Sequence, residues 1–552
     1  MNGLERLRRT PADAARLARS ARVLAASGLL RPMPPGAVLR AALSVARDGL
    51  SPATAYAYSA ARWPRRLALV DDCGTLTFAE ARDQAGALAG RLAGEGVAAG
   101  DRVALLCRNH RQVVLAVAAL ASLGADVVML NAAAAGPEVA AVVEAQRIGA
   151  VLHDPDLAGP AAAAGAGVRR ILTWREDGGE QGGGDTAVLG DLPVAARSPF
   201  RLAPRPGSRY VLLTSGTTGR PKGAGRHAPL SLDPVVAILS RVPLRVGDVT
   251  LVAPPLFHAW GFGNLALALV LSSTVVLRRR FDAEATLAAV AQHRVRVLVA
   301  VPAMLAQLAD LPAEVRRRHD TSSLEVVATS GSALPGDLAT RFMDRYGDVL
   351  YNVYGSTEAA WASIATPAEL RADPHTAGRP PAGTDLRVVD RAGTPVAPGA
   401  TGRILVGNAL SATPGALVAT GDLGRVGPDG LLHVDGREDD MIVTGGENVH
   451  PQEVEDVLLA HPGVADVVVV GRPDPAYGQR VHAAVVAAPG ATPSADELRA
   501  FAAERLSRFK VPRSVELVTA IPRTATGKPL RRLVRQPPRP GAAAAGRRPR
   551  RR

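Results

Sequence analysis

The feature that most constrains the fold is a regular alternation of strand-like and helix-like stretches from about residue 66 onward. Strands are expected at RLALVD (66–71) and RVALLC (102–107), with a helix over 78–96 between them. The alternation resumes at YVLLTSG (210–216) and continues to LEVVATSG (324–331). Such βαβ alternation predicts parallel sheets covered by helices. We therefore expect an α/β protein whose large N-terminal part contains two βαβ-type subdomains.

The pattern of expected strands and helices changes twice in the rest of the chain. Short strands and turns after Pro380 predict a small β-barrel-like unit, and mixed strands and helices from MIVTGG (441–446) onward predict a smaller α+β domain. Residues 158–192, rich in Gly and Ala, are expected to form a surface excursion. The expected organisation is a basic arm over 1–50, a large domain over 51–436, a small domain over 437–535 and a disordered Arg-rich tail over 536–552.

Charge and cysteine content limit the class of protein. The formal charge of +14 is concentrated at the ends: residues 531–552 hold nine arginines and no acid, and residues 1–32 carry a net charge of +5. Residues 33–530 are therefore neutral overall, which argues against a nucleic-acid partner, since a nucleic-acid enzyme carries a basic groove in its body. The two cysteines, Cys73 and Cys107, form no CxxC pair, so we expect a cytoplasmic protein.

The N-terminal arm is predicted to contain a helix over 12–26, and no signal peptide or membrane span is visible. The expected arrangement is a helix docked on the body or loosely ordered, and the alternative is peripheral contact with an anionic membrane. Helical spacing would separate arginines from apolar side chains on opposite faces: Arg16, Arg19 and Arg22 on one, and Leu17, Ala21 and Leu24 on the other.

Lysine is rare in this chain. Of 65 basic residues only Lys222, Lys510 and Lys528 are lysine. Arginine is a planar, permanently charged fork, whereas lysine is a compact point charge, so a lysine in this background marks a position where arginine would not serve. Lys222 and Lys528 follow the Gly-containing turns GRPKG and TATGK, and we predict that both are functional.

The stretch YVLLTSGTTGRPKG (210–223) has the composition of a phosphate-binding loop. A Walker loop requires GxxxxGK followed by Ser or Thr at the start of a helix. Here Pro221 precedes the lysine, Gly223 follows it and no helix start follows, so a P-loop NTPase is excluded. Successive glycines and hydroxyls can still offer N–H and O–H donors to phosphate oxygens.

The sequence does not support a dinucleotide site, a serine hydrolase site or a metal site. GFGNLA (261–266) matches a dinucleotide fingerprint, but no strand runs directly into its first glycine. No GxSxG motif of a serine hydrolase is present. His450 and Glu453 have the spacing of metal ligands on a helix, but Pro451 between them indicates a helix start instead.

Four dense stretches follow one another at characteristic distances: VYGSTE (353–358), ATGDLG (419–424), DGREDDMIVTGGENVHPQEVE (435–455) and PRTATGKPLRR (522–532). Together with TSGTTGRPKG, FHAWG (257–261) and SGSALP (330–335), they give a chain that closely resembles the adenylate-forming superfamily over residues 66–535. That superfamily includes acyl-CoA synthetases, luciferases and the adenylation domains of peptide synthetases. The resemblance implies ATP, Mg²⁺ and coenzyme A as cofactors and co-substrates.

The resemblance also implies a two-step reaction. A carboxylate attacks the α-phosphate of ATP, which gives acyl-AMP and pyrophosphate, and the thiol of coenzyme A then displaces AMP. Lys528 would bridge the carboxylate and the α-phosphate, Thr357 would contact that phosphate and Glu358 would bind Mg²⁺. The β- and γ-phosphates would be held by Thr214, Ser215, Gly216, Thr217, Thr218, Gly219 and Lys222.

The remaining family roles concern the nucleoside, the thiol and the domain rotation. Tyr354 would stack on adenine beside the Gly331–Ser332 backbone, and Asp422 and Arg437 would hold the ribose. His258 and Trp260 would lie where acyl group and thiol meet. Asp439 would be the hinge of a mobile small domain, whose Gly445–Gly446 turn would line the pantetheine tunnel.

The form of the motifs favours one branch of the superfamily. GGENVHPQEVE, RFKVPR and PRTATGK resemble those of fatty-acyl- or aryl-CoA ligases, and SGSALPG with LYNVYGSTEAAWA resembles bacterial fatty-acyl-CoA synthetases. We therefore expect a fatty-acyl-CoA ligase. The alternatives are an aryl-CoA ligase, an enzyme that loads a carrier protein, and an impaired adenylate-binding protein. The last is suggested by NALSATPGALVA (408–419), which is shorter than the family's loop and lacks its aromatic residue.

Overall fold

The computed structural model describes residues 11–30, 36, 39, 52–174, 187–188, 209–214, 222–227, 232–356, 359–411, 415–444, 447–474, 478–506, 508–524 and 527–535. The predicted disordered tail over 536–552 and most of the predicted phosphate loop lie outside these residues.

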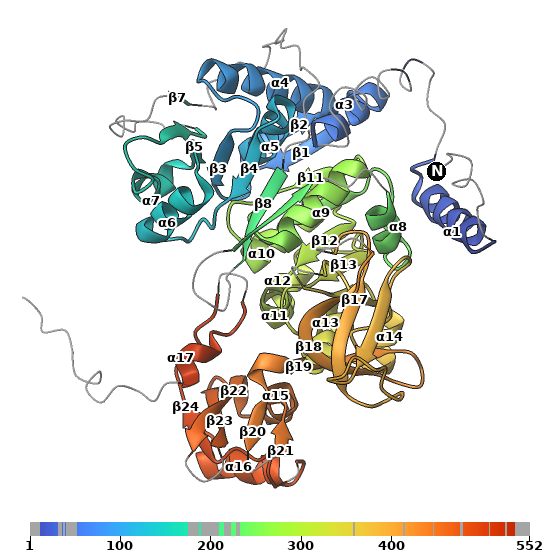
Figure 1. Cartoon of the computed structure of the whole chain (residues 1–552), viewed down its shortest axis with the longest axis vertical. Coiled ribbons are helices and arrows are strands. Elements are labelled where there is room, and N and C mark those ends of the chain that lie inside the picture. The colour runs from blue at the N-terminus through green and yellow to red at the C-terminus, as the bar shows by residue number, and fades with distance from the viewer. Residues whose placement is uncertain are drawn as a thin grey trace, which may run out of the picture.

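Two largely parallel sheets form the large domain (Figure 1). The first has the strand order β15-β14-β13-β12-β10-β11-β1-β2, with antiparallel strands at its two edges. Its central strands are continuous runs of buried Val, Leu, Ala and Thr, as expected where helices cover both faces. The bounds are β1 Leu67–Asp71, β2 Gly74–Thr77, β10 Val249–Val252, β11 Thr274–Val276, β12 Val297–Ala300, β13 Val326–Thr329, β14 Leu350–Tyr354 and β15 Ser363–Ala365.

The second sheet has the order β7-β6-β5-β3-β4-β8-β9. One of its strands, β6, lies inside the segment expected to be a surface excursion, so that expectation is wrong for 169–172. β6 pairs in parallel with β5 and buries Ile171. The bounds are β3 Arg102–Leu106, β4 Asp126–Met129, β5 Ala150–His153, β6 Arg169–Leu172, β7 Ala187–Val188, β8 Arg209–Thr214 and β9 Lys222–His227.

The main hydrophobic core joins the two sheets through the helices packed between them. The helix α5 is almost wholly covered, since nine of its residues are buried. No helix among the described residues is long and apolar enough to cross a membrane. The helices of the large domain are α3 Pro52–Arg62, α4 Phe78–Gly94, α5 Arg111–Leu123, α6 Gly136–Gln146, α7 Ala158–Ala162, α8 Asp233–Leu239, α9 Ala259–Val270, α10 Ala283–His293, α11 Pro302–Asp310, α12 Ala313–Arg317, α13 Gly336–Tyr346 and α14 Pro367–Ala372.

Two smaller units follow. The β-rich unit is a four-stranded antiparallel sheet of β16 Asp385–Val389, β17 Gly402–Gly407, β18 Val418–Val426 and β19 Leu432–Arg437. After the short helix η4 (Glu438–Asp440) the chain enters a separate five-stranded sheet with its own core. That domain comprises β20 Ile442–Thr444, β21 Glu447–Val449, α15 Pro451–Leu459, β22 Val464–Asp474, β23 Gly478–Ala487, α16 Ala495–Ala503, β24 Ser514–Leu517 and α17 Arg531–Arg535.

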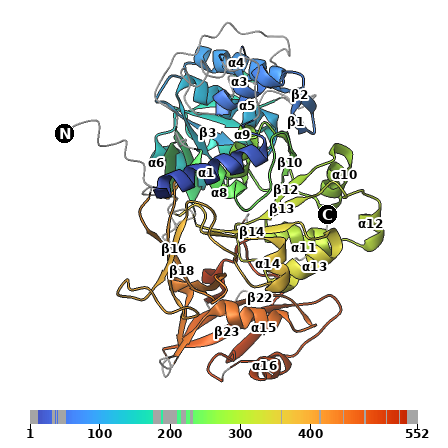
Figure 2. The same ribbon diagram turned by 90° about the vertical axis from the view of Figure 1, so that its right-hand side faces the viewer.

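The predicted N-terminal helix is present as α1 (Pro11–Ser27) and lies beside α8 (Figure 2). The expected apolar face is wrong in part. Leu24 is buried, but Leu17 is 47% exposed and Ala21 is also exposed. The described side chains of α1 that are buried, Leu24 and Ser27, lie near its C-terminal end, so contact with the body there, and not the spacing of leucines, sets the buried face.

Candidate active site

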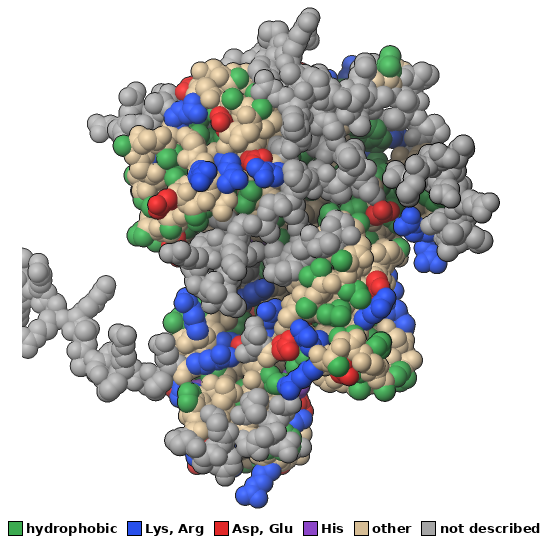
Figure 3. Space-filling model, viewed as in Figure 1, with side chains coloured by type: hydrophobic (Ala, Val, Ile, Leu, Met, Phe, Trp, Pro, Cys, Tyr) green, Lys and Arg blue, Asp and Glu red, His purple; other side chains and the backbone are tan. Residues whose placement is uncertain are grey.

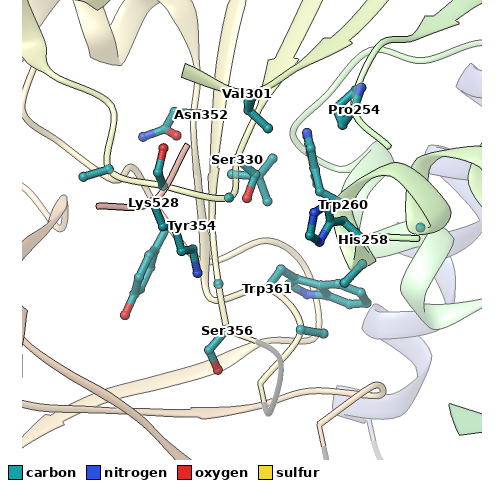
Figure 4. Close-up of a pocket in the computed structure, with 18 of the residues that line it drawn as sticks. Pro254, His258, Trp260, Val301, Ser330, Asn352, Tyr354, Ser356, Trp361 and Lys528 are labelled. Carbon is teal, nitrogen blue, oxygen red and sulfur yellow. The ribbon is translucent and has the colours of Figure 1, made fainter. Parts of the chain in front are cut away.

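A cleft of about 3150 Å³ opens at the carboxyl ends of the first sheet's parallel strands and is also lined by the small domain. The carboxyl edge of an open α/β sheet is where ligands bind in such folds. The loops after β10, β12 and β13 contribute His258, Val301 and Gly331 to its wall, and the last residue of β14 contributes Tyr354. Figure 4 shows Tyr354 and Lys528 on one side of this cleft and His258, Trp260 and Trp361 on the other.

Tyr354, Asp422 and Arg437 come together as the resemblance implies. The Tyr354 hydroxyl donates to Asp422 Oδ2 (2.5 Å), and Arg437 Nη1 lies 3.4 Å from Asp422 Oδ1. Burial raises the pKa of Asp422, an effect opposed by the Tyr354 hydroxyl, Arg437 and Lys528. The ring, the carboxylate and the guanidinium can therefore bind a nucleoside: the ring by stacking and the charged groups by hydrogen bonds to ribose hydroxyls.

The backbone around this cluster requires glycine at a specific point. Asp422 and Arg437 are register partners on β18 and β19, which fixes their proximity. Gly421 has φ +78°, and a β-carbon there would stand 2.9 Å from Arg437 Nη2. Any other residue would be strained and would displace the guanidinium. The glycine of the TGD motif thus makes room for Arg437.

Gly331 and Ser332 lie just beyond β13 and line the same cleft. Gly331 has φ +97°, a conformation that favours glycine. Gly355, after Tyr354, is confined more tightly, because a β-carbon there would come within 2.0 Å of Ala360 O. These close approaches hold the Tyr354 segment and its neighbouring turn in a fixed position.

Lys528 reaches the cleft from the small domain. Its segment is a tight turn in which Thr524 N donates to Lys528 O (2.8 Å) and Lys528 N donates to Thr524 Oγ1 (3.1 Å). Among the described basic side chains that line the cleft, only Lys528 and Arg532 have no carboxylate partner in the described part of the chain. The others are Arg425, Arg437, Lys510, Arg523 and Arg531. The Lys528 ammonium is thus available to an anionic ligand.

Lys510, the third lysine, has a different role. Its ammonium is paired with both oxygens of Glu453, at 2.6 and 2.8 Å. Glu453 is in the first turn of α15, which His450 caps and Pro451 begins, so the helix-start interpretation of this segment is confirmed. The pair joins two elements of the small domain and is structural.

His258 and Trp260 lie at the start of α9, as the N-cap and the second residue. Trp260 Nε1 donates to Ala300 O at 2.9 Å, which fixes the indole against the end of β12. Burial and, to a smaller degree, the Lys528 ammonium lower the pKa of His258 to about 4. The imidazole is therefore neutral at physiological pH. The dinucleotide fingerprint GFGNLA lies within α9, and the rejection of that motif is confirmed.

Several predicted site residues lie outside the described residues: Ser215, Gly216, Thr217, Thr218, Gly219, Thr357, Glu358, Gly445 and Gly446. Thr214 and Lys222 are described as backbone only, and they are register partners at the end of the β8–β9 hairpin. A strand, β9, therefore begins at Lys222, where a Walker loop would begin a helix. Asp439 lies in η4, between the two small sheets, and its hinge role stays a prediction.

The sequence did not single out Trp361 and Asn408 as site residues. The buried Asn408 amide donates to Ala359 O (2.6 Å) and Trp361 O (2.8 Å), and Trp361 Nε1 donates to Thr384 Oγ1 (3.0 Å). The shortened loop that begins at Asn408 is thus tied to the segment that follows YGSTE. An asparagine at the start of an unusual loop and one of only four tryptophans were the available signals.

Comparisons with known proteins agree with this geometry. The sequence model of the AMP-binding enzyme family matches residues 56–415, and that of the AMP-binding enzyme C-terminal domain matches residues 453–528. The chain belongs to the adenylate-forming AMP-binding enzymes. The predicted fold, the recognition of the family and its use of ATP are thereby confirmed.

Similar members of the AMP-binding enzymes are mostly CoA ligases. The chain is 37% identical to feruloyl-CoA synthase of Amycolatopsis sp over 86% of this chain and 98% of that protein. It is 34% identical to indoleacetate–CoA ligase of Aromatoleum aromaticum over 84% of this chain and 93% of that protein. Among solved structures, o-succinylbenzoate CoA synthetase of Bacillus subtilis with its acyl-adenylate gives a TM-score of 0.74 at 28% identity, over 88% of this chain and 98% of that one.

Proposed function

We propose that this AMP-binding enzyme is an aryl-CoA ligase: it converts an aromatic carboxylic acid to its acyl-adenylate with ATP and transfers the acyl group to coenzyme A. The observation that carries the ligase chemistry is the Lys528 ammonium, which has no carboxylate partner among the described residues and lines the same cleft as the Tyr354–Asp422–Arg437 cluster. The aromatic substrate replaces the fatty acid expected from the sequence.

The composition of the cleft wall supports an aromatic acid. Phe, Trp and Tyr make up only 3% of the chain, yet Phe257, Trp260, Phe262 and Trp361 line the cleft around the start of α9, together with the imidazole of His258. Aromatic faces and edges pack favourably on a planar ring. The named relatives that act on feruloyl, indoleacetate and succinylbenzoate groups point the same way.

Four described site residues, Tyr354, Asp422, Arg437 and Lys528, have a role in the proposed first step. Tyr354, Asp422 and Arg437 orient the nucleoside, so that the α-phosphate faces the acid pocket. The Lys528 ammonium lies between two anions, the carboxylate and the α-phosphate, and reduces their repulsion. Preorganised charge of this kind is worth about 3 kcal/mol of barrier. Glu358, the expected Mg²⁺ ligand, is outside the described residues, and we assign the ion to no other carboxylate.

The neutral His258 suits a site for anionic substrates, because an uncharged imidazole does not compete with Lys528 for them. Trp260 and Trp361 keep water away from the reactive mixed anhydride.

The test is a panel of acids with ATP and coenzyme A, in which AMP and thioester are measured together. Ferulate, indoleacetate and benzoate should give thioester and AMP in equal amounts, with kcat/KM at least about tenfold above that for octanoate and palmitate. A higher kcat/KM for the fatty acids would overturn the aromatic assignment and leave the ligase chemistry standing.

A carrier-protein acceptor is the second candidate. It is favoured by the 29% identity to the fatty acid–[acyl-carrier-protein] ligase ScoC of Streptomyces coeruleorubidus, over 86% of this chain and 93% of that protein. Acyl-AMP that accumulates with coenzyme A and is consumed on addition of a phosphopantetheinylated carrier would support it. An impaired adenylate-binding protein would show no acid-dependent exchange of pyrophosphate into ATP.

A further inference from the structure

We infer that the N-terminal segment that contains α1 closes the far end of the acid pocket and limits the length of the acid that the enzyme accepts. The inference rests on the proposed function for the position of the reacting carboxylate. Its own basis is the continuity of the cleft from Lys528 to Leu24, Leu29 and Leu30.

The helix α9 provides the long wall of this pocket. Trp260, Asn264, Leu267 and Val270 line the cleft at helical spacing, so one face of α9 borders it along its whole length. From Trp260 to Val270 the helix rises about 15 Å. Gly263 lies on the same face, and a β-carbon there would meet nothing within 4 Å. The wall is therefore open to a ligand that extends away from the reaction centre.

The end of the cleft remote from Lys528 is apolar. It is lined by aliphatic side chains of the N-terminal segment and of α8: Leu24, Leu29, Leu30, Leu232, Val235 and Ile238. This end suits the hydrophobic tail or ring substituent of an acid.

The N-terminal segment is anchored where it reaches the cleft. Val246 N donates to Ser27 O (2.8 Å), Leu24 is 9% exposed and Leu29 packs against the main core. In contrast, the arginines Arg16, Arg19 and Arg22 are exposed. The match to the AMP-binding family model begins at residue 56, so α1 lies before the part of the chain that the family shares. The length limit is thus a property of this chain.

Substitutions at Leu29 test the inference in the full-length protein. The panel pairs a short and a long acid of each class: benzoate with 4-butoxycinnamate, and butyrate with decanoate. Leu29→Trp should lower kcat/KM for the long acid by about tenfold and leave the short acid within about twofold. Leu29→Ala should raise the ratio of kcat/KM for the long acid to kcat/KM for the short acid. Leu17→Trp is the matched control, because Leu17 is on the same helix, is 47% exposed and does not line the cleft.

The possible failures are distinguishable. If aryl acids are not turned over and fatty acids are, the proposed substrate is wrong. The ratio of kcat/KM for decanoate to kcat/KM for butyrate then still tests whether the N-terminal segment limits acid length. If Leu29→Trp changes kcat/KM equally for long and short acids, or changes it for neither, the N-terminal segment does not limit the length of the acid. Should Leu29→Trp fail to fold, Leu30→Trp carries the same expectation, because Leu30 is 55% exposed and a larger side chain there disturbs no core packing.

Discussion

Gly527 lies against Ala303, so that a β-carbon on Gly527 would stand 3.2 Å from the β-carbon of Ala303. Gly527 belongs to the small domain and directly precedes Lys528, whereas Ala303 is in the first turn of α11 in the large domain. This contact places the Lys528 turn at the end of β12. The proposed first half-reaction would use this arrangement, in which Lys528 lines the cleft.

Gly527→Ala should therefore impair adenylation. The added methyl group would crowd Ala303 and would also be strained at φ +81°. We expect acid-dependent ATP–pyrophosphate exchange to fall about tenfold, with conversion of supplied acyl-AMP to thioester largely retained. Gly490→Ala is the matched control, since Gly490 has φ +78° but nothing lies within 4 Å of its added β-carbon. Equal losses in both variants would show that backbone strain, not the domain contact, is responsible.

Lys528→Ala should separate the two half-reactions more completely. Loss of the bridging ammonium should lower the rate of pyrophosphate exchange by about 10²- to 10³-fold. Thioester formation from supplied acyl-AMP should stay within a few-fold of the wild-type rate. Arg508→Ala, which removes an exposed charge that does not line the cleft, should leave both rates unchanged. A matching fall in the two half-reactions of Lys528→Ala would contradict the assigned role.

Tyr354→Phe tests the nucleoside cluster. The variant keeps a ring for stacking but removes the 2.5 Å hydrogen bond to the buried Asp422. Hydrogen bonds to charged groups are worth about 1.5–3 kcal/mol, so the KM for ATP should rise roughly 10- to 100-fold while the KM for the acid changes little. A rise in the acid KM alone would place Tyr354 in the acid pocket instead.

Asn408→Ala should destabilise the large domain by about 2 kcal/mol or more, because it leaves the buried carbonyls of Ala359 and Trp361 without their donor. Urea unfolding measures the loss. The half-buried Asn131 side chain accepts a local hydrogen bond from Ala133 N, and no bond to a distant segment is found for it among the described residues, so Asn131→Ala should cost less. If the two variants unfold at the same urea concentration, Asn408 does not hold the Trp361 segment.

The pH dependence of stability should contain a contribution from His258. Its pKa is about 4 in the folded protein against 6.5 for the ordinary group, so between these values the unfolded chain binds a proton that the native protein does not. The free energy of unfolding should therefore fall as the pH falls from 6.5 to 4, by an amount on the order of 3 kcal/mol for this group. His258→Gln should remove that part of the slope. Parallel pH profiles for wild type and variant would contradict the low pKa.

Much of the fold could be predicted because most strands and helices are indicated by patterns of neighbouring residues in the sequence. The strands of the large domain are continuous apolar runs, and the order of the motifs identified the family. β6 was missed because RRIL has only two apolar residues and its pairing with β5 is a long-range property. The buried face of α1 was also misjudged, because only contact with α8 and Val246 determines which side is covered.

The candidate site was predictable to the extent that each role belongs to a motif. Tyr354, Asp422, Arg437 and Lys528 meet in one cleft as expected. The substrate class could not be obtained in this way, since the pocket wall combines side chains from α1, α8 and α9 with Trp361. Asn408 acts on a segment almost fifty residues earlier, and no local pattern indicates that contact.

Lys and Arg side chains are more numerous than Asp and Glu side chains on the face of the small domain near the large domain in Figure 3. Arg531 pairs with Glu455, and Arg535 pairs with Asp440 beside the predicted hinge residue. Three of the nine C-terminal arginines, Arg531, Arg532 and Arg535, thus lie in helix α17 of the folded small domain.

The most direct test of the account is the product analysis of one reaction that contains ferulate, ATP and coenzyme A. We predict feruloyl-CoA and AMP in equal amounts from the wild-type protein, and both products formed about 10²- to 10³-fold more slowly by Lys528→Ala. Absence of both acid-dependent pyrophosphate exchange and thioester in the wild-type protein, with ferulate and with every other acid of the panel, would contradict it.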